Sequence, residues 1–214
     1  MPRFTTVLFD LDGTLIDHFA AIHRCHAHTM ATLGLPPPTL AQVRAAVGGG
    51  LEAAIERIAG PEHVAAAVPI YRAYWETIVL DDVALLPGAR ELLTMLHARG
   101  AKLAVFTNKL GSSSRLICEH LGIASLLDGN FGAKDTEWIK PAAEFAAHAL
   151  AEIGAAPATT VLIGDSPYDV QAAHNGGFPC WVVTTGTHSA EELRAAGADA
   201  VFANLTALGA ALTS

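Results

Sequence analysis

The sequence predicts an α/β protein whose core is a doubly wound parallel sheet, with a mostly helical lobe inserted after the first strand. From residue 88 onward, short apolar strands alternate with helical patterns, which is typical of a parallel sheet. Three strands, 7–9, 103–106 and 161–163, are almost entirely apolar, as expected where helices cover both faces. The helical pattern over 18–80 is too long for a crossover connection, so we expect a separate lobe there.

Apolar runs and glycine punctuation define the elements in chain order. The expected strands are 5–10, 102–106, 160–163, 180–183 and 200–202. Glycine is favoured just past a helix end, and it closes most of the helical patterns. The expected helices of the α/β part are 89–99, 112–121, 142–153, 168–175, 190–196 and 205–212.

The inserted lobe should hold several helices, because glycine and proline interrupt its pattern at 34–38, 48–50 and 60–61. Leu86-Pro87-Gly88 marks the return to the α/β part. We therefore expect an α/β domain formed by 1–16 and 84–214, and a helical domain formed by 17–83. Tyr71 and Trp75 lie at helical spacing, which favours a place in the core of the helical domain.

Composition restricts the function classes. The chain has 214 residues and a net charge of -8, and it has no basic run, which disfavours binding to nucleic acid. Its three cysteines are far apart and form no CxxC pair, so neither a disulfide framework nor a zinc site is expected. We see no secretory signal and no apolar run long enough to span a bilayer, so we expect no membrane partner and a cytoplasmic location.

Polar side chains follow three of the apolar strands. The carboxyl ends of parallel strands lie at one edge of the sheet, where open α/β sheets bind their ligands. The residues expected at this edge are Asp10, Asp12, Thr107, Asn108, Asp165 and Asp169, with Lys140 within reach from the segment before the third strand. Clustered carboxylates repel one another unless a cation lies among them, and hard oxygen ligands beside a phosphate favour Mg²⁺. The set therefore indicates phosphoryl transfer, in which the metal and the lysine neutralise approaching anions.

These segments resemble the haloacid dehalogenase-like (HAD) superfamily, and the resemblance extends over essentially the whole chain. It is carried by DxDGTLxD at 10–17, a strand ending in Thr107, Lys140-Pro141 and GDxxxD at 164–169. The resemblance implies a Rossmann-like core and makes the helical insert a cap domain. It implies that Asp10 is the nucleophile and that Asp12 is the general acid and base. Thr107, Asn108 (through its backbone amide) and Lys140 would bind the phosphoryl group.

The same resemblance implies the metal ligands. Mg²⁺ would be held by the side chains of Asp10 and Asp165 and by the backbone carbonyl of Asp12, while Asp169 would support the metal from behind these ligands or approach it through water. Dehalogenase members lack an aspartate at the position of Asp12, so a phosphatase or a phosphomutase is favoured. Gly13-Thr14 favours a phosphatase. The triplet Thr107-Asn108-Lys109 and the segment 47–51 look like the phosphoglycolate phosphatase-like subgroup.

Three functions stay open at this point. A Mg²⁺-dependent phosphatase of a small phosphorylated metabolite, acting as a monomer or homodimer, is the leading one, and phosphoglycolate is one candidate substrate. A sugar phosphomutase resembling β-phosphoglucomutase would isomerise its substrate without net release of phosphate. A catalytically idle binding protein would bind a ligand without turnover.

The helical domain offers weaker candidates for substrate contacts. His18 directly follows the first motif, Arg44 lies on a helix before the glycine run, and Gly48 begins that run. We expect these three residues to contact substrate. His23 and His26 lie three residues apart on one helix face, but no acid or cysteine joins them at ligand spacing, so a transition-metal site is disfavoured.

Overall fold

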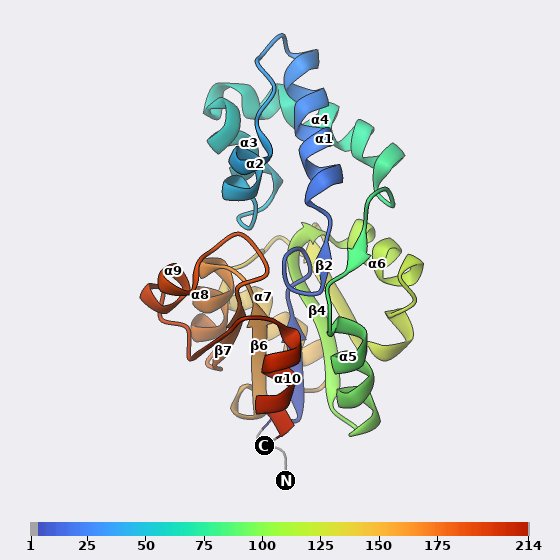
Figure 1. The fold of residues 1–214 in the computed structure, drawn as a ribbon, viewed down its shortest axis with the longest axis vertical. Coiled ribbons are helices and arrows are strands. Elements are labelled where there is room, and N and C mark those ends of the chain that lie inside the picture. The colour runs from blue at the N-terminus through green and yellow to red at the C-terminus, as the bar shows by residue number, and fades with distance from the viewer. Residues whose placement is uncertain (1–3, 214) are drawn as a thin grey trace. The chain divides into compact units, whose positions relative to one another are not determined.

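The computed structural model describes residues 4–213, which divide into two compact units (Figure 1). The first unit comprises Met1–Asp17 and Leu85–Ser214, and the second comprises His18–Ala84. The assignment of the second unit as a cap domain stays a prediction. Within the described residues, no helix has both the length and the apolar character needed to cross a bilayer.

The first unit is built on a parallel sheet with the strand order β5-β4-β1-β6-β7-β8. In the described residues its strands are β1 (Thr6–Phe9), β4 (Lys102–Leu110), β5 (Gly129–Ala133), β6 (Thr160–Gly164), β7 (Cys180–Val183) and β8 (Ala200–Phe202). The first strand lies between β4 and β6, so Phe9 is in register with Val105 on one side and with Ile163 on the other. The doubly wound α/β fold class is confirmed.

Helices cover both faces of this sheet (Figure 1). They are α5 (Ala89–Ala98), α6 (Gly111–His120), α7 (Ala143–Glu152), α8 (Pro167–Asn175), α9 (Ala190–Ala195) and α10 (Leu205–Thr213), with short 3-10 turns at Ala124–Leu126 and Pro157–Thr159. Each predicted helix of this unit is present, with ends that differ by a few residues at most. A small second sheet pairs β2 (Ile16–Asp17) with β3 (Ala84–Leu85), where the chain leaves and rejoins the first unit.

Three strands are absent from the sequence prediction, namely β5 of the central sheet and the two-residue strands β2 and β3, and the predicted strand 102–106 is shorter than β4. The edge strand β5 reads Gly-Asn-Phe-Gly-Ala, a composition of low strand propensity, and it pairs with β4 alone. A Cβ on Gly129 would lie 2.6 Å from the ring of Phe131, so side-chain packing requires a glycine there. The other difference is in β4, which continues to Leu110 through an irregularity after Phe106.

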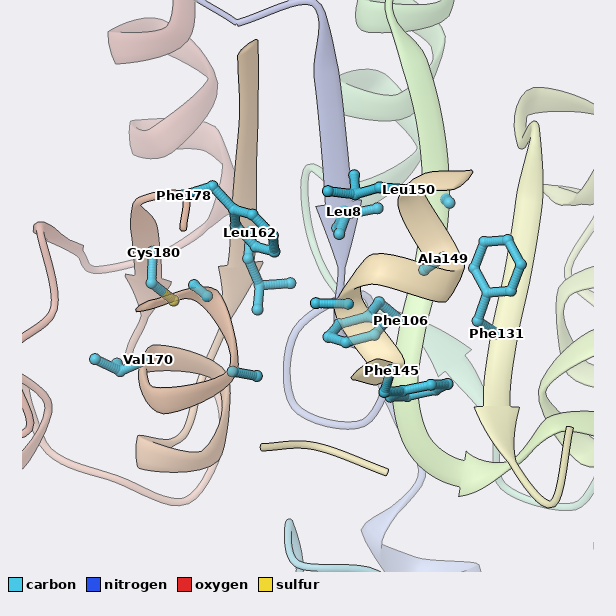
Figure 2. Close-up of a cluster of buried hydrophobic side chains, with 14 of the residues drawn as sticks. Leu8, Phe106, Phe131, Phe145, Ala149, Leu150, Leu162, Val170, Phe178 and Cys180 are labelled. Atoms are coloured by element: carbon cyan, nitrogen blue, oxygen red, sulfur yellow. The ribbon is translucent and has the colours of Figure 1, made fainter. Parts of the chain in front are cut away.

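The core on one face of the sheet is formed by strand residues and by helices α7 and α8 (Figure 2). The rings of Phe106 on β4 and Phe145 on α7 stack with their centroids 4.5 Å apart. Leu8, on β1, and Leu162, on β6, are fully buried in the same cluster. This packing fixes the central strands whose ends carry the polar residues described below.

The second unit consists of four helices: α1 (Phe19–Thr32), α2 (Leu40–Ala46), α3 (Leu51–Ala59) and α4 (Pro61–Ile78). Its three helix breaks fall at the predicted glycine and proline positions. Thr39 begins α2 with a capping box to Gln42. Tyr71 and Trp75 are buried in α4 with nearly parallel rings, as their spacing predicts.

Candidate active site

The candidate site lies at the carboxyl edge of the central sheet of the first unit. Asp10 follows β1, Thr107 and Asn108 lie near the end of β4, and Asp165 follows β6. Because these three strands are adjacent and parallel, their ends converge on one place. Residues far apart in the sequence thus come together, as the strand-end pattern predicts.

Three buried carboxylates form the centre of this site. Asp10, Asp165 and Asp169 each offer an oxygen, and these oxygens lie within 4.8 Å of one another. The Nζ of Lys140, only 2% exposed, donates to Oδ1 of Asp10 and to Oδ1 of Asp169, at 2.7 Å in both cases. A single lysine therefore faces three acids.

The electrostatics of the cluster show that it carries too much negative charge for its surroundings. Burial raises the pKa of Asp10 to about 6; Lys140 opposes this shift, and the charge of Asp169 adds to it. Burial, with the charges of Asp10 and Asp169, also raises the pKa of Asp165 well above its ordinary value. Burial by itself would lower the pKa of Lys140, but its two carboxylate partners raise it. A second cation among hard oxygen ligands would relieve this repulsion, so the donor set fits a divalent metal ion.

Asp165 is oriented through both of its oxygens. Thr14 Oγ1 donates to Oδ1 at 3.3 Å, and the backbone N–H of Thr187 donates to Oδ2 at 3.4 Å. Two glycines make room for this carboxylate. A Cβ on Gly13 would lie 2.6 Å from Oδ2 and a Cβ on Gly186 would lie 1.7 Å from it, so neither position accommodates a side chain without movement.

Asp169 is surrounded by donors on both of its oxygens. It lies in the first turn of α8, and its Oδ2 accepts from Ser166 N at 3.0 Å, from Ser166 Oγ at 2.6 Å and from Asp165 N at 3.2 Å. Its Oδ1 accepts from Lys140. With these oxygens engaged by the protein, Asp169 is arranged to hold Lys140 and the Asp165 backbone in place. A role as a metal ligand stays a prediction.

Two of the three residues predicted to bind a phosphoryl group, Asn108 and Lys140, are linked to each other. The side-chain amide of Asn108 donates to the carbonyl of Lys140 at 3.0 Å, and its Oδ1 accepts from the Lys140 backbone N–H at 2.8 Å. This double hydrogen bond fixes the segment that carries Lys140 against the end of β4. The hydroxyl of Thr107 accepts from the backbone N–H of Lys109 at 3.2 Å.

Asp12 lies near the three grouped acids, since its charge acts on Asp10, but its side chain is paired with a different lysine. Lys109 Nζ is 2.9 Å from Oδ2 and 3.1 Å from Oδ1 of Asp12. Both side chains are largely buried, with exposed fractions of 8% for Lys109 and 10% for Asp12. The two aspartates of the first motif are thus paired with different lysines.

Comparisons with known proteins identify the family of this chain. A family model described as haloacid dehalogenase-like hydrolase matches residues 7–183, which include the three strand ends and Lys140. The chain belongs to this family. The expectation of an HAD-type enzyme is therefore confirmed.

Individual relatives of this HAD protein are named as phosphatases. A probable phosphatase, IndB, of Dickeya dadantii is 34% identical over 89% of this chain and 85% of its own length. A phosphoglycolate phosphatase of Caulobacter vibrioides is 34% identical over 92% of this chain and 85% of its own length. The crystal structure of a predicted phosphatase from Clostridium acetobutylicum has a TM-score of 0.91 and 27% identity, covering 98% of both chains.

The second unit of the HAD protein contains the three predicted substrate residues. His18 is buried just before α1, its Nε2 lies 3.1 Å from the carbonyl of Asp81, and its ring contacts Trp75. The guanidinium of Arg44 lies 4.1 Å from the ring centroid of Phe19. Gly48 lies in the connection between α2 and α3 with a φ of 119°. A role of these residues in substrate binding stays a prediction.

Several residues that contact the candidate site of the HAD protein are not among those predicted from the sequence. Thr14 lies in the motif at 10–17 and Ser166 in the motif at 164–169. The aspartates beside them in the sequence are the signal that could have indicated contacts with the site. Gly186 and Thr187 lie in the loop after β7, a loop that carries no motif, and only the fold brings them to Asp165. Lys109 belongs to the triplet Thr107-Asn108-Lys109, but its pairing with Asp12 depends on the pairing of β1 with β4.

Proposed function

We propose that the protein is a Mg²⁺-dependent phosphatase that hydrolyses a small phosphomonoester through a phosphorylated Asp10. The observation that carries the proposal is the buried carboxylate of Asp10, which is paired with Lys140 and grouped with Asp165 and Asp169. An isolated structural ion pair would not need two further buried acids beside it, because each buried charge is costly. The names of the relatives support the same reaction class.

The donor set suits Mg²⁺. Side-chain oxygens of Asp10 and Asp165 and the backbone carbonyl of Asp12 would hold the ion, and Asp169 would support it. When bound, Mg²⁺ would offset the repulsion between the attacking carboxylate and the phosphate. Lys140 supplies a fixed positive charge for the same purpose.

The reaction would proceed in two halves, in which Asp10 is the nucleophile and Asp12 transfers the protons. An oxygen of Asp10 forms a bond to phosphorus while the bond from phosphorus to the leaving oxygen breaks, and Asp12 gives its proton to that oxygen. In the second half, water attacks phosphorus, Asp12 takes a proton from this water, and the bond from phosphorus to Asp10 breaks. Thr107, the backbone amide of Asn108 and Lys140 would hold the phosphoryl oxygens throughout.

The substrate that we propose is a small soluble phosphorylated metabolite, with phosphoglycolate as the first candidate because several relatives are named for it. His18, Arg44 and Gly48 would contribute to its selection. We expect the protein to act in the cytoplasm as a monomer or homodimer.

The test is a phosphate-release assay with purified protein and Mg²⁺. The panel should contain phosphoglycolate, sugar phosphates, nucleoside monophosphates, phosphoserine and pyrophosphate. Asp10→Asn is expected to reduce turnover by at least about a thousandfold, since it removes the nucleophile. Glu91→Gln is the matched control, because it removes one exposed carboxylate from α5 of the same unit. Mass spectrometry of quenched wild-type enzyme is expected to find one phosphoryl group on the protein, absent from Asp10→Asn.

Two results would contradict the proposal. Turnover that persists in Asp10→Asn would exclude Asp10 as the nucleophile. A sugar phosphate that is isomerised without release of phosphate would identify a phosphomutase.

A further inference from the structure

The ion pair between Lys109 and Asp12 has a geometry that restrains the carboxylate. One ammonium donates to both oxygens of Asp12, at 2.9 and 3.1 Å. Two contacts to one carboxylate oppose its rotation, whereas a single contact would leave it free to turn. The pair is mostly buried, so water competes weakly for either partner.

Lys109 is itself held in place by the sheet. It lies on β4, which pairs with β1 directly before Asp10. Its backbone N–H donates to the hydroxyl of Thr107 at 3.2 Å. The same residue therefore links two parts of the proposed site: the carboxylate of Asp12 and the hydroxyl of Thr107.

The two buried lysines have separate partners. Lys140 contacts Asp10 and Asp169, whereas Lys109 contacts Asp12. Lys109 is paired with Asp12, and Asp12 is the residue proposed to transfer protons. This division indicates a role in placing Asp12.

We propose that Lys109 is a positioning residue that holds the Asp12 carboxyl group where it can reach the leaving oxygen; this inference rests on the proposed phosphatase function. One oxygen of Asp12 keeps its contact with Lys109, and the other carries the proton that moves to the leaving oxygen as its bond to phosphorus breaks. Lys109 acts through Asp12 and makes no bond to the substrate.

Leaving groups of different basicity distinguish this role from a general structural one. p-Nitrophenolate is a stable anion and departs with little help from a proton, whereas an alkoxide needs one. A misplaced Asp12 therefore slows cleavage of an alkyl phosphate far more than that of p-nitrophenyl phosphate. A substrate-binding lysine would affect both substrates alike, chiefly through KM.

The experiment measures kcat/KM with Mg²⁺ for p-nitrophenyl phosphate and for the alkyl phosphate that the wild type cleaves best. For Lys109→Met we expect a loss of about 10- to 100-fold with the alkyl phosphate and of less than about threefold with p-nitrophenyl phosphate. Lys109→Arg, which keeps a cationic donor, should recover most of the difference. In an Asp12→Asn background, Lys109→Met should cause no further loss. Lys134→Met, at an exposed position, is the control for removal of a lysine.

Two kinetic results would overturn the inference. One is an equal loss of kcat/KM with both substrates in Lys109→Met, and the other is a full additional loss of kcat/KM when Lys109→Met is added to Asp12→Asn. Crystal structures of the wild type and Lys109→Met test the placement without relying on turnover. We expect the Asp12 carboxyl group to leave its position in the variant, and an unmoved, well-ordered Asp12 would also overturn the inference. If the wild type cleaves neither substrate, the proposed function fails and the inference fails with it; if the wild type cleaves both and the losses are equal, only the inference fails.

Discussion

Acidification should destabilise the helical unit through His26. This residue lies on α1, is 1% exposed, and its Nδ1 has no hydrogen-bond partner among residues 4–213. Burial lowers its pKa from 6.5 to about 4, and the charge of His23 adds to this effect. Protonation in the folded state would place a charge beside the Tyr71 ring with no acceptor at Nδ1.

The sign and size of the effect follow from proton linkage. Below pH ~6.5 the unfolded chain binds a proton that the folded chain excludes, so the free energy of unfolding falls as the pH falls. Above pH ~6.5 the free energy of unfolding keeps the full contribution of His26. That contribution is lower by about 1.4 kcal/mol at pH ~5.5, and by about 3 kcal/mol once the pH is well below the folded pKa.

The assay is urea unfolding at pH ~7.5 and pH ~5.5, comparing wild type with His26→Gln, whose side chain does not titrate. Trp75 reports on the helical unit when Trp138 and Trp181 are replaced by Phe in both proteins. Between pH ~7.5 and pH ~5.5, we expect the free energy of unfolding to fall by about 1.4 kcal/mol more in the wild type than in His26→Gln. His28→Gln is the matched control, because it removes an exposed imidazole from the same helix. Parallel losses in wild type and His26→Gln would refute the reasoning.

Three further predictions concern the α/β unit. Gly186→Ala should push the Asp165 carboxylate aside and weaken Mg²⁺ binding by about tenfold or more, measured by titration calorimetry. Lys140→Met should lower the free energy of unfolding of the metal-free protein by about 3–5 kcal/mol, measured by urea unfolding, because Asp10 keeps its burial and loses its cation. Phe145→Ala should lower the free energy of unfolding by about 3–5 kcal/mol in the same assay, because it removes a fully buried ring from the core.

Each of these has a control and a result that would contradict it. Gly209→Ala tests a glycine remote from the acids, and equal Mg²⁺ affinities in Gly186→Ala and wild type would contradict the steric argument. Adding Asp169→Asn to Lys140→Met should recover part of the lost stability, and a further loss would show that charge repulsion is not the cause. For Phe145→Ala, a cost below that of a typical surface substitution would mean that the core collapses around the missing ring.

The sequence predicted most of the central sheet and the convergence of polar residues at its edge, because both depend on local patterns. Apolar runs such as 161–163 identify buried strands whatever their neighbours are. Acids directly after such runs, as at Asp10 and Asp165, must lie at the carboxyl edge once the strands are parallel. The edge strand β5 was missed because its two glycines and single large apolar residue give no such pattern, and its stability comes from pairing with β4.

The sequence by itself determined which residues could perform chemistry at the sheet edge, since strand ends and their following residues are set by chain order. Only the tertiary structure decided how those residues are paired. Lys109 lies beside Asp12, and Gly186 beside Asp165, because strand pairing and loop packing bring together segments far apart in the chain. Such contacts require atoms to be placed to within a few tenths of an ångström. Residue type and spacing along the chain do not reveal that placement before the fold is known.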